Sequence, residues 1–261
     1  MALSNVARVS VLACFGAIVV AASPAAARQE SLPPASEIID RYQQAIGGRD
    51  ALLRQPSSRS TGRVEIPAAG FTGTLEIVYG EPDRMLMVMN IAGAGEIRTV
   101  FDGSVGWITN PMTGPMLLDG DLLEQTRADA DVRTKLREGP NIEALETVER
   151  TERNGEACHR VRVTWTSGRE TFDCYSIETG LLIATEGVQE SPFGSAEVTI
   201  VIGDYVEFDG VRVPTRVVHR TMGLEQIMIL DSVQHGPADP SIFEPPAEIQ
   251  ALIRASAPQA P

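Results

Sequence analysis

The sequence lacks the short motifs by which many enzymes and metal-binding proteins are recognised. It contains no Gly-x-Ser-x-Gly nucleophile elbow, no His-Glu-x-x-His and no glycine-rich phosphate loop. It also lacks a Cys-x-x-Cys-His haem motif, and its three histidines have no metal-ligand spacing. Asp129 and Asp131 fall on a predicted helix, where a solvated face is favoured over a calcium site. Paired carboxylates of the glycosidase kind have no fixed spacing, but we expect no catalytic residue, no metal and no cofactor.

Basic residues are also scarce. The chain has 22 Lys and Arg against 35 Asp and Glu, a formal net charge of −13. Such a surface repels the phosphates of nucleic acids and the anionic head groups of membranes. We therefore exclude a nucleic-acid partner. The balance suits a carrier that must not adhere to membranes, and it equally suits ordinary solubility.

Long apolar runs are missing except near the start. The run from Val9 to Ala22 follows Arg8, and the small residues Ala25 to Ala27 come after it. This order predicts a secretory signal peptide over residues 1–27, cleaved after Ala27. Cys14 lies inside the apolar run, which disfavours lipid attachment there. The remaining chain is expected to be periplasmic.

Only two cysteines follow the predicted leader. Cys158 and Cys174 flank a predicted hairpin that turns at Ser167 and Gly168. A strict two-residue turn would place the two side chains on opposite faces of the hairpin, whereas a bulge or a longer loop would bring them together. Since an exported protein meets an oxidising compartment, the pair is a candidate disulfide, with both alternatives open.

Short apolar runs separated by turn residues fill the rest of the sequence. Between Gly70 and Pro111, four such runs are divided most clearly at Glu81-Pro82-Asp83 and at Asp102-Gly103. Pro presets a turn dihedral and Asp-Gly tolerates the positive φ of a tight hairpin. The runs are too short for helices and predict an antiparallel meander. Asn154-Gly155 and Asp209-Gly210 predict further hairpins in the second half.

Two helices interrupt these strands. The first is predicted from Glu37 to about Ile46, with Ser36 as its N-cap and one apolar face. The second is predicted from Leu122 to about Arg137, capped by Asp119 or Asp121. We expect a single domain over residues 28–254, followed by a disordered tail over residues 255–261.

One pattern resembles a known family. Val100-Phe101-Asp102-Gly103, followed by Trp107 and Asn110-Pro111, is similar to the pattern of periplasmic outer-membrane lipoprotein carriers of the LolA/LolB type. The resemblance implies a mostly β (α+β) fold: an incomplete, strongly curved antiparallel β-barrel with helices covering the open mouth. In those carriers an arginine precedes the turn proline and ties the lid closed. Here that position holds Glu81, and Arg84 is a candidate substitute.

The resemblance also implies a function. It is the binding and transport of a hydrophobic ligand, such as a lipid or the acyl chains of a lipoprotein, in the half-barrel cavity. The alternative is a non-catalytic regulatory or envelope-assembly module that binds a protein partner, including one in the inner or outer membrane. Residues of one strand parity and one helix face are the candidates for the apolar cavity lining, namely Ile38, Ile39, Tyr42, Leu75, Ile77, Met87, Met89 and Trp107.

Overall fold

A computed structural model of the chain describes residues 31–192 and 194–256. The chain divides into two units, residues 1–31 and 32–261, and the sheet and helices belong to the second. The predicted signal peptide and residues 257–261 of the predicted tail lie outside the described residues. Ala255 and Ser256, which we expected in the disordered tail, belong instead to the last helix.

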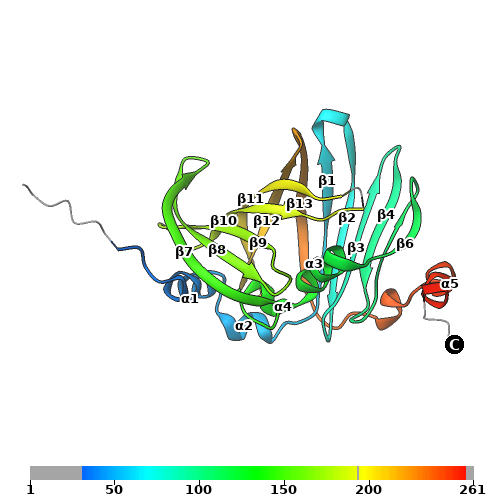
Figure 1. Ribbon diagram of the computed structural model, residues 1–261, viewed down its shortest axis with the longest axis horizontal. Coiled ribbons are helices and arrows are strands. Elements are labelled where there is room, and N and C mark those ends of the chain that lie inside the picture. Colours follow the sequence, from blue (N-terminus) through cyan, green and yellow to red (C-terminus); the bar gives the residue numbers. More distant parts are fainter. Residues whose placement is uncertain (1–30, 193, 257–261) are drawn as a thin grey trace, which may run out of the picture. The chain divides into compact units, whose positions relative to one another are not determined.

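The described unit is built on one antiparallel sheet of 13 strands. A first series of hairpins comprises β1 (Ser58–Ile66), β2 (Phe71–Gly80), β3 (Arg84–Ile91), β4 (Gly95–Phe101), β5 (Gly106–Asn110) and β6 (Gly114–Leu117). A second series comprises β7 (Ile142–Arg153), β8 (Glu156–Trp165), β9 (Glu170–Ser176), β10 (Leu182–Gln189), β11 (Ala196–Phe208), β12 (Val211–Thr221) and β13 (Leu224–His235). The two series join where β1 pairs with β13, so β6 and β7 are the unpaired edges. The predicted curved, unclosed half-barrel is confirmed (Figure 1).

Tight turns set the register of several hairpins. Asn154-Gly155 and Asp209-Gly210 both adopt positive φ at their two positions, and they connect β7 to β8 and β11 to β12. Met222-Gly223 makes the same kind of turn between β12 and β13. Such turns match the twist of the flanking strands, which is why Asn-Gly and Asp-Gly are the strongest sequence signals for them. Met-Gly carries a weaker signal.

Short helices complete the fold. They are α1 (Ala35–Ala45), α2 (Arg49–Leu53), α3 (Gly120–Ala130), α4 (Val132–Lys135) and α5 (Ala247–Ser256), with the 3-10 turns η1 (Pro67–Ala69) and η2 (Pro240–Phe243). Helices α3 and α4 connect the edge strands β6 and β7, and they lie between the two halves of the sheet in Figure 1. Helix α5 contacts β6.

Two helix predictions need correction. The first helix begins at Ala35 with Pro34 in the N-cap position, so Ser36 lies inside the helix and caps nothing. The second predicted helix is two helices, because Asp131 leaves the helical conformation. Its carboxylate accepts a 2.9 Å hydrogen bond from the backbone N–H of Arg133 and thereby caps α4. The break at Asp131 allows α4 to run in a direction different from that of α3.

Cys158 and Cys174 form a disulfide. In the register of β8 and β9, Cys174 pairs with Arg160 and Cys158 pairs with Ser176. Five residues, 165–169, therefore separate the last paired residues of the two strands, which is the longer of the two loops considered. Both cysteines point to one face, with their Cα atoms 5.5 Å apart and both side chains buried.

The two faces of the first strand series are covered differently. One face, here called the cavity face, carries Tyr79, Met85 and Phe101, which pack with Ala130 at the end of α3. The opposite face, here called the α5 face, packs against η2 and α5 through Val78, Leu86, Val100, Trp107, Phe243 and Ile249. Strand alternation separates the two sets. The cavity face is the one from which the site is built.

Candidate functional site

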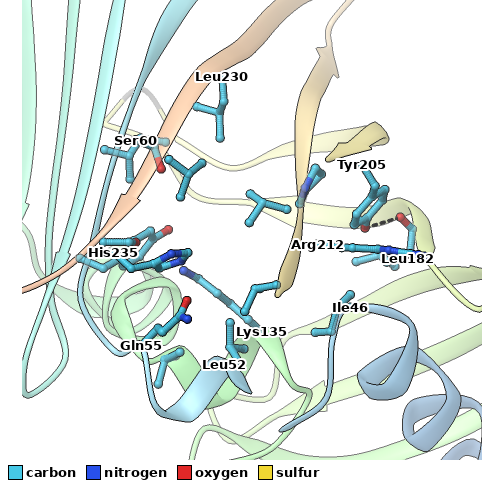
Figure 2. A pocket seen from close by; sticks show the side chains of 18 of the residues that line it. Ile46, Leu52, Gln55, Ser60, Lys135, Leu182, Tyr205, Arg212, Leu230 and His235 are labelled. Carbon is cyan, nitrogen blue, oxygen red and sulfur yellow. Dashed lines mark hydrogen bonds between the residues drawn. The ribbon is translucent and has the colours of Figure 1, made fainter. Parts of the chain in front are cut away.

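A cavity of about 310 Å³ lies on the cavity face, between the sheet and the helices α1, α2 and α4 (Figure 2). Most of its wall is aliphatic. The apolar lining comprises Ile46, Leu52, Ile77, Val132, Leu182, Val211, Val213, Pro214, Val217, Leu230 and Val233. Ligand sites in proteins commonly begin at about 300 Å³, which suits a compact apolar group or one alkyl chain.

The predicted lining residues of α1, β2 and β3 fall into three groups. Tyr42 and Ile77 line the cavity. Ile38 and Ile39 lie on the same face of α1 but pack in the helix core beside it. The third group is Leu75, Met87 and Met89, which do not line the cavity. They share the face of Ile77, because Leu75 pairs with Met89 and Ile77 pairs with Met87. The predicted residues of these two strands therefore share one face, and Ile77 is the one among them that lines the cavity.

Trp107 is on the wrong face for the predicted role. It pairs with Val100 across β4 and β5, and both pack on the α5 face against Phe243 and Ile249. The residue that shares the face of Ile77 on β5 is its neighbour, Ile108. Since successive side chains alternate between faces, a one-residue difference in register reverses the assignment. Trp107 therefore anchors α5.

A single ammonium group lies in this apolar setting. Of the 22 basic residues, 21 are arginines, and Lys135 is the one lysine of the sequence. Its side chain extends from the end of α4 into the cavity (Figure 2). The Nζ atom lies 3.3 Å from the centroid of the Tyr79 ring, a cation–π contact. Sequence reasoning missed this residue, although its being the sole lysine was a visible signal.

Burial dominates the electrostatics of Lys135. Desolvation lowers the pKa of its ammonium to about 8, and the charge of Asp129 opposes this shift. Within residues 31–192 and 194–256, no carboxylate forms an ion pair with Lys135. The group is still mostly protonated at neutral pH. It therefore places a positive charge beside an apolar hollow, with Asp129 as its electrostatic neighbour but without a direct ion pair in the described part of the chain.

We expect Lys135→Met to stabilise the ligand-free protein by about 1–3 kcal/mol at neutral pH. The folded-state pKa, about 8, lies below the unfolded value of about 10.4. Between these values the unfolded chain binds more protons, so wild-type stability rises with pH there and the advantage of the variant shrinks. Urea unfolding at about pH 7 and pH 10 measures the difference. A variant that is less stable than wild type at both pH values would contradict this prediction.

The next cationic group along the chain is neutralised by a buried carboxylate. Arg137 Nε donates a 2.5 Å hydrogen bond to Asp173 Oδ2, and the Asp173 side chain is fully buried. Tyr175 and Thr185 donate further hydrogen bonds to the same carboxylate at 3.0 and 2.7 Å. The pair holds the pKa of Arg137 well above its ordinary value against the opposing effect of burial. This network holds together the part of the sheet that packs against α1, and the charge of Arg137 is already paired.

A salt contact connects α4 to the β2–β3 turn. Arg133 Nη2 lies 3.8 Å from Asp83 Oδ2, and its Nε donates a 2.8 Å hydrogen bond to Asp131. Both Arg133 and Asp83 are more than 40% exposed, so the contact contributes less than about 1 kcal/mol. Neither Glu81 nor Arg84 forms an ion pair with another residue of the described part of the chain.

The described residues hold neither a metal cluster nor a membrane-spanning helix. Across residues 31–192 and 194–256, no group of three or more His, Cys, Asp or Glu side chains is arranged to hold a metal ion. In the same residues, no helix combines the length and apolar character needed to cross a membrane.

Solved structures share this fold. A LolA superfamily protein from Nitrosomonas europaea aligns with a TM-score of 0.56 at 12% identity, over 82% of this chain and 99% of that one. A DUF1329 family protein from Desulfovibrio piger aligns with a TM-score of 0.57 at 11% identity, over 84% of this chain and all of the other. No family model and no curated protein matches the sequence. At these identities the likeness concerns the fold, and the LolA-like resemblance seen in the sequence is confirmed at that level.

Proposed function

We propose that the protein binds the alkyl chain of a lipid or of a lipidated protein in the cavity beneath α1, α2 and α4. The observation that carries this proposal is a largely apolar hollow of about 310 Å³ that lies between helices and a curved sheet. Each methylene removed from water is worth about 0.8 kcal/mol. A chain of several methylenes therefore gains a large part of a micromolar binding free energy, about −8 kcal/mol, by entering such a space.

We further propose that the protein works outside the cytoplasm, in the periplasm of a bacterium. Two observations support this placement. The predicted signal peptide occupies residues 1–27, and Cys158 and Cys174 form a disulfide. Structural disulfides persist in oxidising compartments and are rare in reducing ones. Lipids and lipidated proteins that cross this aqueous space need a shield for their apolar chains.

The test is the binding of a fluorescent acyl-chain probe, with a charge introduced at the cavity wall. We expect Ile77→Asp to weaken binding about tenfold or more, because a carboxylate beside the alkyl chain would lose its hydration. Met87 shares the face of Ile77 but does not reach the cavity, so Met87→Asp should have a smaller effect. Arg98→Glu is the matched control, since Arg98 pairs with Val88 and Thr109 on the other face.

Equal effects at all three positions would contradict the proposed site. Circular dichroism and thermal unfolding of each variant separate lost binding from lost folding. Lipid extraction and mass spectrometry of the purified protein provide an independent test. If no lipid co-purifies and no probe binds, the module that binds a protein partner becomes the better interpretation.

A further inference from the structure

We propose that Lys135 binds the anionic head group of a single-chain amphiphile whose alkyl chain occupies the cavity. The inference rests on the proposed function and adds the chemical class of the ligand to it. A fatty acid carboxylate and the phosphate of a monoalkyl ester share the required chemistry, a negative charge at the end of one alkyl chain.

The charges of the cavity wall are opposite to those of the protein. The chain carries 35 acidic against 22 basic residues. Among the described residues that line the cavity there are three basic side chains and a histidine, and no Asp or Glu. Since acidic residues dominate elsewhere, a wall without them favours an anion over a neutral or cationic ligand.

Two of these groups face a carboxylate, and a third is exposed to solvent. Arg137 is paired with buried Asp173, and His235 Nδ1 lies 3.1 Å from Asp209 Oδ2. Arg212 is exposed, and its backbone N–H donates a hydrogen bond to the carbonyl of Ile46. Lys135 differs from all three, because it is partly buried and its ammonium forms no direct ion pair within residues 31–192 and 194–256, although the charge of Asp129 acts on it.

The surroundings of Lys135 leave its ammonium free to bind an anion. Tyr79 covers one side through its ring face, and no side chain or carbonyl of the described part of the chain accepts a hydrogen bond from Nζ. An ammonium has three donors and no acceptor. A carboxylate or phosphate at this point would satisfy these donors and form a charge-assisted hydrogen bond. Figure 2 shows the Lys135 side chain reaching into the cavity with its nitrogen towards His235. Aliphatic residues line much of the same cavity, so the head and tail of one molecule can be held together.

The charged and titratable groups around Lys135 define the expected pH dependence. They are Tyr79 on β2, Asp129 on α3, Arg137 after α4, Arg212 on β12 and His235 on β13. Burial lowers the pKa of Lys135 to about 8, so the ammonium is present at neutral pH and is lost above that value. Fatty acid carboxylates stay ionised throughout. Affinity for the anion should therefore fall about threefold or more between about pH 7 and pH 9.5.

The binding experiment compares three single-chain probes of equal length: laurate, 1-dodecanol and dodecyltrimethylammonium. Isothermal titration of the wild-type protein should give the order laurate, dodecanol, dodecyltrimethylammonium, from tightest to weakest. Lys135→Met should weaken laurate about tenfold and leave dodecanol unchanged, while Lys135→Arg should keep laurate within about threefold of wild type. Dodecyl phosphate in place of laurate shows which anionic head is preferred.

The sole lysine permits a direct second measurement. Reductive methylation with isotopically labelled formaldehyde marks Lys135 and the N-terminal amine, the two primary amines of the chain. Laurate should shift the nuclear magnetic resonance signal of methylated Lys135 and raise its pKa, whereas dodecanol should leave that pKa unchanged. This readout does not depend on the folding of any variant.

The outcomes separate this inference from the proposed function. If laurate and dodecanol bind equally well and Lys135→Met changes neither, the role of Lys135 is overturned while the apolar site stands. If none of the probes binds, the apolar site itself fails. If dodecyltrimethylammonium binds most tightly, or if laurate changes neither the chemical shift nor the pKa of methylated Lys135, the proposal that the ligand has an anionic head group is wrong.

Discussion

Asp173→Ala is expected to lower the free energy of unfolding by about 3–5 kcal/mol. The substitution removes the partner of Arg137, whose Nε lies 2.5 Å from Asp173 Oδ2, and leaves a guanidinium that is 12% exposed without its counter-charge. Tyr175 and Thr185 lose their hydrogen-bond acceptor as well. Unsatisfied buried donors add to the loss, because each keeps its desolvation cost.

Chemical denaturation followed by circular dichroism measures this effect. Glu225→Ala is the matched control, because Arg220 and Glu225 form a 2.7 Å ion pair in which both side chains are nearly half exposed. That control should change stability by less than about 1 kcal/mol. The double variant Arg137→Met with Asp173→Leu should recover much of the loss, since it removes both charges together. A loss below about 1 kcal/mol for Asp173→Ala would show that the network is not structurally important.

Replacing Cys158 and Cys174 together by alanine is expected to lower the free energy of unfolding by about 3 kcal/mol. The disulfide spans a sequence separation of 16 residues, and cross-linking such a loop restricts the unfolded chain. Both cysteines are buried beside Ala184 in a small apolar cluster, so the alanines also lose packing contacts.

Guanidinium unfolding with and without a reductant provides the measurement. The reductant should lower the midpoint of the wild-type protein towards that of the double variant, and it should leave the double variant itself unchanged. If reduction does not alter the wild-type midpoint, the cross-link contributes no stability. The result also bears on location, because a protein that needs this disulfide is suited to an oxidising compartment.

The local structure was largely predictable from the sequence. Asn154-Gly155 and Asp209-Gly210 turn as their residue types require, because their positive φ values are ones that Asn, Asp and Gly tolerate. The first helix was placed within two residues at its start and one at its end. The break at Asp131 was missed, since Asp129 and Asp131 were considered only for a solvated face or a calcium site.

Long-range placement was harder to predict. The face of Trp107 depends on the register between β4 and β5, which the loop between them sets and which alternation within one strand cannot supply. The position of Lys135 depends on the break at Asp131 and on the packing of α4 over the sheet. Neither feature is local in sequence. The cavity itself joins residues from α1 to β13, so no single stretch of sequence reveals it.

The pairing of β1 with β13 has a consequence for how the chain acquires its structure. Ser58 lies opposite His235, so the central seam of the sheet joins segments from the two ends of the described unit. The hairpins of each series can form while the chain is still being synthesised. The pairing of β1 with β13 can form only after β13, the last strand, has been made. Contacts between such distant segments slow folding. A newly made chain therefore stays incompletely assembled until its synthesis is nearly finished, a state compatible with threading across a membrane.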